Sequence, residues 1–203
     1  MNDTDWVIID TETTGLVSPI HVVEIAGQRM RGWEPMGEPF HAYLNHGVRV
    51  PSDAVAIHGL TTEFLRRNGQ SPVDAHRAFA AYTGNAPLVA HNLWYDWDQC
   101  LLSEWRRLAF RSPATKGFCT MHLGRRVLPE VPRVRLDTLR KLFGLSAEGA
   151  HSALGDVRTV IEVFQRVYRP RLEKAGLNTF EAMRSFSRLT PIRKCHERVL
   201  KQG

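Results

Sequence analysis

The fold is decided by a ten-residue stretch near the N-terminus, Val7-Ile8-Ile9-Asp10-Thr11-Glu12-Thr13-Thr14-Gly15-Leu16. An apolar run that is typical of a buried strand ends in two carboxylates separated by one residue. Because side chains alternate between the faces of a strand, Asp10 and Glu12 project from the same face. Two neighbouring acids repel each other unless a positive charge lies between them, and carboxylate oxygens suit Mg²⁺ or Mn²⁺. Two acids separated by one residue also fit a strand that ends in a solvated turn, so further acids are needed to indicate a metal site.

The composition is that of an ordinary globular domain. The chain has 203 residues, of which 43% are hydrophobic and 24% charged, and it is long enough to bury a substantial core. No apolar run approaches the roughly 18 residues of a membrane span, and the N-terminal residues do not resemble a secretory signal. The cysteines are odd in number and scattered, which indicates reduced thiols and a cytoplasmic location.

Charge is distributed unevenly along the chain. Residues 1–100 contain 6 Lys and Arg against 12 Asp and Glu, and residues 101–203 contain 21 against 9, so the two parts carry −6 and +12 and give the net charge of +6. An acidic part that can hold cations beside a basic part suits a polyanionic substrate such as nucleic acid. Charge alone leaves a solvated basic surface as the alternative.

The pattern of apolar residues predicts an α/β fold with a mixed sheet. Strands are expected at the opening stretch and at residues 21–26, 40–44, 87–92 and 118–120. Short connections make the first three strands an antiparallel meander, and a strand–loop–helix crossover adds parallel strands. Glu24, an acid in the apolar second strand, is either a group near the metals or an outward-facing edge residue.

Helices are expected between and after these strands. The predicted helices cover residues 51–58, 61–67, 72–83, 93–110, 121–127, 136–143 and 152–175. Pro170 is expected to kink or end the last of these, because proline lacks the backbone N–H of a helix interior. Residues 1–175 therefore form the expected domain, and residues 176–203 a basic C-terminal tail with two short helices.

Two later segments place acids at the edges of regular elements. In His91-Asn92-Leu93-Trp94-Tyr95-Asp96, an acid lies at the start of a helix that directly follows a strand. In His151-Ser152-Ala153-Leu154-Gly155-Asp156, a histidine lies in the loop before a helix and an acid follows five residues later. The chain thus offers four carboxylates and one imidazole that can meet at one site.

Three ordered motifs resemble the DEDDh group of 3′→5′ exonucleases, which has the RNase H-like fold. They are Asp10-Thr11-Glu12, His91-Asn92-x-x-Tyr95-Asp96 and His151-x-Ala153-x-x-Asp156. The related group that uses tyrosine would have it at position 152, where this chain has serine, so the histidine type is favoured. The resemblance implies a five-stranded RNase H-like sheet flanked by helices. Residues 118–126 are similar to exonuclease X and to polymerase proofreading subunits, although the C-terminal sequence differs from that of several exonuclease X-like proteins.

The resemblance implies a two-metal phosphodiesterase. Asp10, Glu12 and Asp156 would hold one divalent cation, Mg²⁺ or Mn²⁺. Asp10 would bridge to a second cation, which Asp96 would hold partly through water. Two ions about 3.5–4 Å apart can activate the attacking water and stabilise the leaving 3′ oxygen. His151 would accept the proton of the water, because the pKa of histidine suits that task near neutral pH. The products would be nucleoside 5′-monophosphates.

The resemblance also implies contacts with the 3′-terminal nucleotide. Thr13 and Gly15 would meet it through the turn backbone, Leu16 would wedge against the last base, and His58 and Asn92 would lie beside the nucleotide and its phosphate. Leu16 can equally be a turn residue that packs on the core, and His58 can have a purely structural role.

DNA is the favoured substrate, with single strands preferred, in DNA repair or together with a polymerase. An RNA-trimming exonuclease of the same family stays open, because no residue reads the 2′-hydroxyl decisively. A non-catalytic nucleic-acid-binding module is the alternative from another class, but it has no need of four mutually repulsive acids. A zinc site is disfavoured, because Cys119, His122, Cys195 and His196 lack the spacing of a zinc finger.

Overall fold

The computed structural model describes residues 4–200, and a five-stranded sheet lies at its centre. The strands, in the spatial order β3-β2-β1-β4-β5, are β1 (Asp5–Thr13), β2 (Val22–Arg31), β3 (Glu34–Tyr43), β4 (Pro87–Ala90) and β5 (Thr115–Cys119). The first three strands pair antiparallel, and β4 and β5 are added parallel to β1. The predicted mixed sheet is confirmed.

The hairpin between β2 and β3 is longer than the sequence pattern predicts. Both strands extend to a tight turn at Gly32, and the pairing continues to Arg31 opposite Glu34. The outer part of β3 is exposed on both faces, so it has no apolar alternation that could mark it as a strand. Its glycine and proline residues also resemble a loop, and the pairing with β2 is irregular there, between Gly27 and Arg29 of β2.

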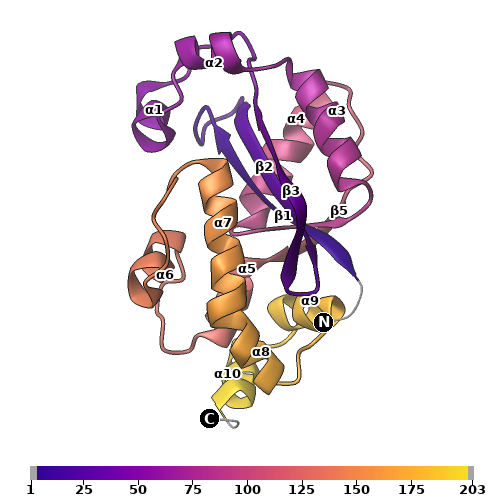
Figure 1. The fold of residues 1–203 in the computed structure, drawn as a ribbon, viewed down its shortest axis with the longest axis vertical. Helices are drawn as coiled ribbons and strands as arrows, with labels where there is room; N and C mark the ends of the chain where they lie inside the picture. The colour runs from indigo at the N-terminus through magenta and orange to yellow at the C-terminus, as the bar shows by residue number, and fades with distance from the viewer. Residues whose placement is uncertain (1–3, 201–203) are drawn as a thin grey trace.

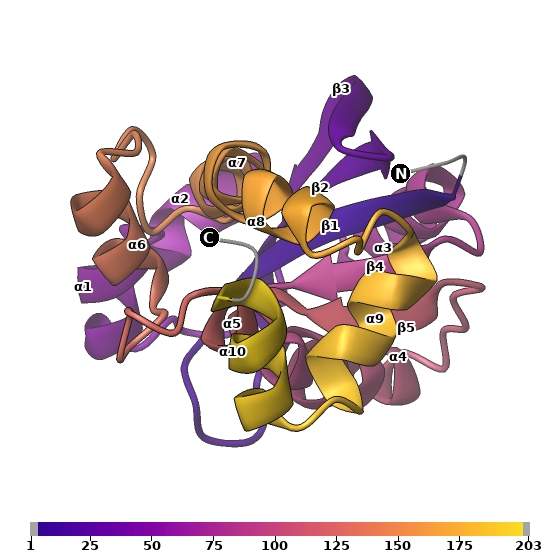
Figure 2. The ribbon, with the colours of Figure 1, turned by 90° about the horizontal axis from the view of Figure 1, so that it is seen from below.

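Helices cover both faces of the sheet (Figures 1 and 2). On one face lie α3 (Pro72–Thr83), η1 (Trp94–Leu101) and α4 (Leu102–Arg107). On the other lie α5 (Thr120–Val127), α6 (Leu136–Phe143), α7 (Ala153–Val163), η2 (Phe164–Tyr168), α8 (Arg169–Lys174), α9 (Phe180–Arg188) and α10 (Ile192–Leu200). The short helices α1 (Ser52–His58) and α2 (Thr62–Asn68) form a third cluster beside β2. Among residues 4–200, no helix has the length and apolar character to cross a membrane.

Side chains of β1 alternate between two hydrophobic cores. Trp6 and Ile8 are buried with α5, α7 and α9, whereas Val7 and Ile9 are buried with α3, η1 and α4. By the same period of two, the residues at positions 10 and 12 follow Trp6 and Ile8 onto the face that α7 covers (Figure 1). The strand therefore places Asp10 and Glu12 beside the start of α7.

Two of the predicted long helices contain wide, π-helical turns. The helix after β4 begins as η1 and ends at Arg107, and the helix of residues 152–175 is interrupted by η2 between α7 and α8. Pro170 does not end the helix: it lies in the first turn of α8, directly after the wide turn η2, and the helical segment continues to Lys174.

The C-terminal segment forms two short helices, as predicted, and these pack against α5 (Figure 2). Phe180, Met183 and Cys195 belong to the same buried cluster as Trp6. The segment is thus integrated into the core, and the domain boundary at residue 175 stays a prediction.

Candidate active site

Three carboxylates converge at the carboxyl end of β1. Asp10 and Glu12 come from the strand and Asp156 from the first turn of α7, and one oxygen of each lies within 4.8 Å of the others. A single cation can contact all three at that spacing. No other group of His, Cys, Asp or Glu side chains between residues 4 and 200 is arranged for a metal in this way.

Asp96 is held at the same strand end by a side chain of β1. The Thr11 hydroxyl donates a hydrogen bond of 2.7 Å to Asp96 Oδ1, and Asp96 itself is buried. Thr11 stands between Asp10 and Glu12 in the strand and points to the opposite face. Asp96 is therefore fixed next to the three carboxylates, although it lies outside their compact group.

Burial and mutual repulsion raise the pKa of Asp10, Glu12 and Asp96. Burial, together with the charges of Asp96 and Asp156, raises the pKa of Asp10 well above its ordinary 3.8. Burial and the charge of Asp156 raise the pKa of Glu12 to about 8. Burial raises the pKa of Asp96 to about 7 against the opposing hydrogen bond from Thr11. Hard oxygen donors crowded in this way fit a divalent cation, whose charge removes the repulsion.

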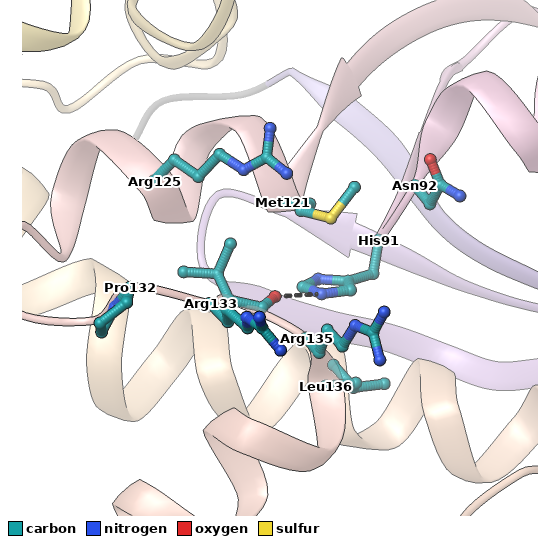
Figure 3. A pocket seen from close by; sticks show the side chains of 9 residues that line it. His91, Asn92, Met121, Arg125, Pro132, Arg133, Arg135 and Leu136 are labelled. Carbon is teal, nitrogen blue, oxygen red and sulfur yellow. Dashed lines mark hydrogen bonds between the residues drawn. The ribbon is translucent and has the colours of Figure 1, made fainter.

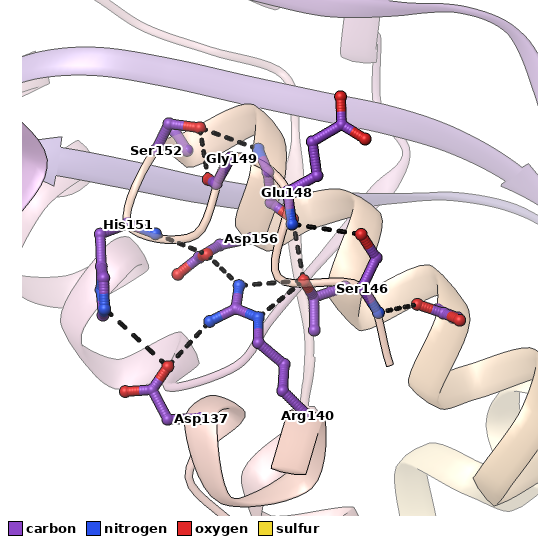
Figure 4. Close-up of polar contacts among 12 residues, drawn as sticks. Asp137, Arg140, Ser146, Glu148, Gly149, His151, Ser152 and Asp156 are labelled. Carbon is purple, nitrogen blue, oxygen red and sulfur yellow. Dashed lines mark hydrogen bonds and ion pairs between the residues drawn. The ribbon is translucent and has the colours of Figure 1, made fainter. Parts of the chain in front are cut away.

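Arg140 lies behind Asp156 and fixes its carboxylate (Figure 4). The guanidinium is buried, and its Nη2 donates to Asp156 Oδ1, while Nη1 donates to Asp137 Oδ1 at 2.9 Å. The Thr159 hydroxyl accepts from Nε at 3.1 Å and from Nη2 at 2.9 Å. These bonds limit Asp156 to one orientation. The role of Arg140 was not predicted from the sequence. Its position next to Leu139, on the buried side of α6, is a signal, because a buried arginine needs an acidic or polar partner.

His151 lies in the loop before α7, at the rim of the acid cluster. Its backbone N–H donates to Asp156 Oδ1 at 3.2 Å. Its half-exposed ring faces Asp137, with 3.9 Å between Nε2 and Oδ1 (Figure 4), which is too long for a hydrogen bond. The loop folds back on α7 closely enough that a Cβ on Gly155 would lie 1.9 Å from the Gly149 carbonyl oxygen. Gly155 is therefore required for the position of the His151 loop.

The turn after Glu12 is braced from two sides. The Tyr95 hydroxyl is 2.7 Å from Thr13 Oγ1 and donates to the Gly15 carbonyl at 3.0 Å. His58 Nε2 donates to the Thr13 carbonyl at 3.1 Å, because its Nδ1 accepts a backbone N–H and so carries no proton. Leu16 is 80% exposed at the tip of this turn, so it does not pack on the core.

His91 and Asn92 at the end of β4 differ in their surroundings. His91 Nε2 donates to the Val134 carbonyl at 2.7 Å, and its Nδ1 is 2.9 Å from the Thr120 hydroxyl. Burial lowers the pKa of His91 to about 4, so the ring is neutral and structural. Asn92 is exposed, has a positive φ of 149°, and lines a pocket next to His91 (Figure 3).

Glu24 is a buried anchor for α7. Its Oε1 is 2.6 Å from His41 Nε2, and its Oε2 accepts the Ala153 backbone N–H at 3.1 Å. A carboxylate at the first turn of a helix stabilises that end through the unpaired N–H groups there. Of the two interpretations of Glu24, the structure supports a group near the acid cluster, because it fixes the start of the helix that carries Asp156.

Known proteins share both the sequence pattern and the fold. A protein of Mycobacterium tuberculosis named as a bifunctional exonuclease/endonuclease is 32% identical over 212 residues, which cover 98% of this chain and 32% of that protein. The DNA polymerase III subunit epsilon of Aquifex aeolicus is 26% identical over 186 residues, which cover 90% of this chain and 89% of that subunit. The chain therefore spans about a third of the mycobacterial relative.

A solved structure of Escherichia coli exonuclease I in complex with a dT13 oligonucleotide superposes with a TM-score of 0.71 at 19% identity, over 84% of this chain and 43% of that one. This likeness confirms the predicted RNase H-like fold. The model of the RNase_T family, described as Exonuclease, matches residues 7–164, which include the strand end with its two acids, Asp96 and the His151–Asp156 segment. The chain belongs to this exonuclease family, and within it to the DEDDh type of 3′→5′ exonuclease domain.

Proposed function

We propose that the protein is a metal-dependent 3′→5′ exonuclease that releases nucleoside 5′-monophosphates from the 3′ end of DNA, with single strands preferred. The observation that carries this proposal is the convergence of Asp10, Glu12 and Asp156 within 4.8 Å at the end of β1. Membership of the exonuclease family supports the reaction class. A partly buried cluster of acids that lacks a positively charged partner for each carboxylate destabilises the fold, and a cluster that binds catalytic cations accounts for its presence.

Two divalent cations, Mg²⁺ or Mn²⁺, fit the donor set. Asp10, Glu12 and Asp156 would hold one ion, and Asp10 together with Asp96 would hold the other, with Asp96 acting partly through water. When bound, the ions supply an activated water and charge stabilisation for the leaving 3′ oxygen. Arg140 keeps the Asp156 carboxylate turned toward the cluster, and Thr11 does the same for Asp96.

His151 takes up the proton of the attacking water. Its loop position beside Asp156 and its half-exposed ring support this role, because the ring can turn from Asp137 toward the cluster without disturbing the core. The proton on the ring then leaves to solvent, since the rim is open.

The braced turn of Thr13 to Leu16 seats the 3′ end. Backbone groups at Thr13 and Gly15 are held by Tyr95 and His58, so they meet the terminal 3′-hydroxyl without rearrangement. The exposed Leu16 side chain wedges against the last base. Asn92, on the other side of the site, lies beside the terminal phosphate.

The names of the relatives support DNA as the substrate and a DNA polymerase as a partner. A repair protein as partner and a role in DNA repair in the cytoplasm are part of the same proposal. One relative is a polymerase III subunit, and the superposed exonuclease I is bound to a dT13 oligonucleotide. The +12 charge of residues 101–203 supports a nucleic-acid substrate, whether DNA or RNA.

The test is digestion of 5′-labelled DNA and RNA oligonucleotides of the same sequence with Mg²⁺, Mn²⁺ or EDTA. We expect ladders that shorten from the 3′ end only with metal, with DNA degraded faster than RNA. Asp156→Asn is expected to abolish the ladder, whereas Asp53→Asn, which changes an exposed acid of α1, is the matched control and leaves it intact. Internal cuts, or equal cleavage in EDTA, would contradict the proposal.

A further inference from the structure

A pocket of about 530 Å³ lies beside His91 and Asn92, at the end of β4 (Figure 3). At one end it is lined by His91 and Asn92, which directly precede the helix of Asp96. At the other end it is lined by residues 132–136, which lead into α6 with Asp137 and Arg140. The pocket therefore borders the segments that lead to Asp96 and to Asp137, but none of the four acids of the site lines it.

Three arginines dominate the lining of this pocket. Arg125 comes from α5, and Arg133 and Arg135 come from the segment before α6 (Figure 3). All three are exposed, and within residues 4–200 their guanidinium groups make no hydrogen bond or ion pair with the protein. No Asp or Glu lines the pocket. Three like charges gathered without an acid indicate an anionic ligand, and guanidinium groups suit phosphate oxygens in particular.

The arginine-bearing segment is held firmly in place. The Val134 side chain is buried in the core, and its carbonyl accepts the hydrogen bond of 2.7 Å from His91. Arg133 and Arg135 therefore project from either side of a fixed point rather than from a free loop. This arrangement fixes the backbone of both arginines beside the end of β4 before any ligand binds, which lowers the entropy lost on binding.

The basic surface continues away from the site along α5. Arg125 also lines a second pocket of about 410 Å³, together with His122, Arg126, Ser187, Arg188 and Ile192. This second pocket again contains no acid in its lining, and it reaches α9 and the start of α10. The two pockets share Arg125, so they form one track from Asn92 to the C-terminal helices, which we call the arginine track.

We infer that the arginine track binds the sugar–phosphate backbone of the substrate strand on the 5′ side of the scissile bond. The inference rests on the proposed function, which seats the 3′ end at the Thr13 turn and places Asn92 beside the terminal phosphate, and Asn92 also lines the first pocket of the track. Arg133 and Arg135 contact the first phosphates beyond the terminal nucleotide. Arg125, which lines both pockets, contacts the strand where it enters the second pocket. Phosphate contacts of this kind position the strand without reading its sequence.

The test is the double variant Arg133→Ala/Arg135→Ala, with Arg106→Ala/Arg111→Ala as the matched control. All four arginines are exposed, and the control pair lines no part of the track. Substrates are a thymidine oligonucleotide of about twenty nucleotides and the p-nitrophenyl ester of thymidine 5′-monophosphate, which is too short to reach the track.

For the double variant, we expect KM for the oligonucleotide to rise by about 10-fold or more, with kcat and the hydrolysis of the ester unchanged. The slope of log KM against log salt concentration is expected to fall by about 1 to 2, because two phosphate contacts are lost. A KM and salt slope equal to those of the control would overturn the inference, as would an equal loss of activity on the ester.

A binding measurement in EDTA separates this inference from the proposed function. Fluorescence anisotropy of a labelled thymidine oligonucleotide is expected to give a Kd about 10-fold weaker for the track variant than for the wild type and the control. This result supports the track even if the wild type cleaves nothing, in which case only the proposed function fails. Equal Kd values for all three proteins would refute the track.

Discussion

Replacing Glu12 with glutamine is expected to stabilise the metal-free protein at high pH. Burial and the charge of Asp156 raise the pKa of Glu12 from the ordinary 4.5 to about 8 in the folded chain. Because the folded state binds the proton more tightly than the unfolded state, the free energy of unfolding of the wild type falls as pH rises from about 4.5 to 8. At ~1.4 kcal/mol per pH unit this gives ~5 kcal/mol as an upper limit. Since Glu12 shares its repulsion with neighbouring acids and keeps some exposure, about 2–3 kcal/mol is expected.

The assay is urea unfolding of the wild type and Glu12→Gln at intervals between pH 4 and 8.5, in EDTA and in Mg²⁺. In EDTA the variant is expected to match the wild type near pH 4 and to exceed it increasingly up to pH 8. In Mg²⁺ the order is expected to reverse, because only the wild type gains the full free energy of cation binding. Glu148→Gln, at an exposed position, is the control and shows no such trend. A difference in EDTA that does not change with pH would refute the reasoning.

Four further changes test other parts of the site and the fold. His151→Ala is expected to lower kcat by about 10²–10⁴ while Mn²⁺ binding is unchanged, as measured by steady-state kinetics and titration. Arg140→Met is expected to lower kcat more than it raises KM and to reduce the free energy of unfolding by about 2 kcal/mol, because Asp156 loses its buried partner. Glu24→Gln is expected to destabilise the start of α7 by about 1–3 kcal/mol, measured by urea unfolding and by faster amide exchange in the first turn of that helix. Glu104→Gln, at a buried acid of α4, tests the opposite sign of pH dependence. The side chains of His46 and His76 outweigh burial and lower the pKa of Glu104 to about 2, so the wild type should lose about 3 kcal/mol relative to the variant as pH falls from 4.5 to 2, measured by acid unfolding.

The sequence predicted the sheet from simple periodicities, and the resemblance to the DEDDh motifs predicted which acids would meet. Alternation along β1 puts Asp10 and Glu12 on one face, and the parallel pairing of β1 and β4 brings their carboxyl ends to the same edge. The outer part of β3 could not be predicted, since its exposed side chains and its glycine give no apolar pattern.

Contacts between side chains that are far apart in the sequence could not be predicted. Arg140 and Thr159 lie 19 residues apart, and Thr11 and Asp96 lie 85 apart, so their hydrogen bonds depend on how α6, α7 and η1 pack. The wide turn of η1 was also unpredicted, because a π-helix has no distinct sequence pattern and depends on local packing.

Counting the cations is the most direct test of the acid cluster as the catalytic centre. Free Mn²⁺ can be followed by electron paramagnetic resonance during titration of the His151→Ala variant in the presence of thymidine 5′-monophosphate. We expect two Mn²⁺ ions per chain, and we expect an additional Asp156→Asn substitution to weaken binding severely. Failure to bind Mn²⁺, or binding that Asp156→Asn leaves unchanged, would contradict a metal-dependent exonuclease centre at the end of β1.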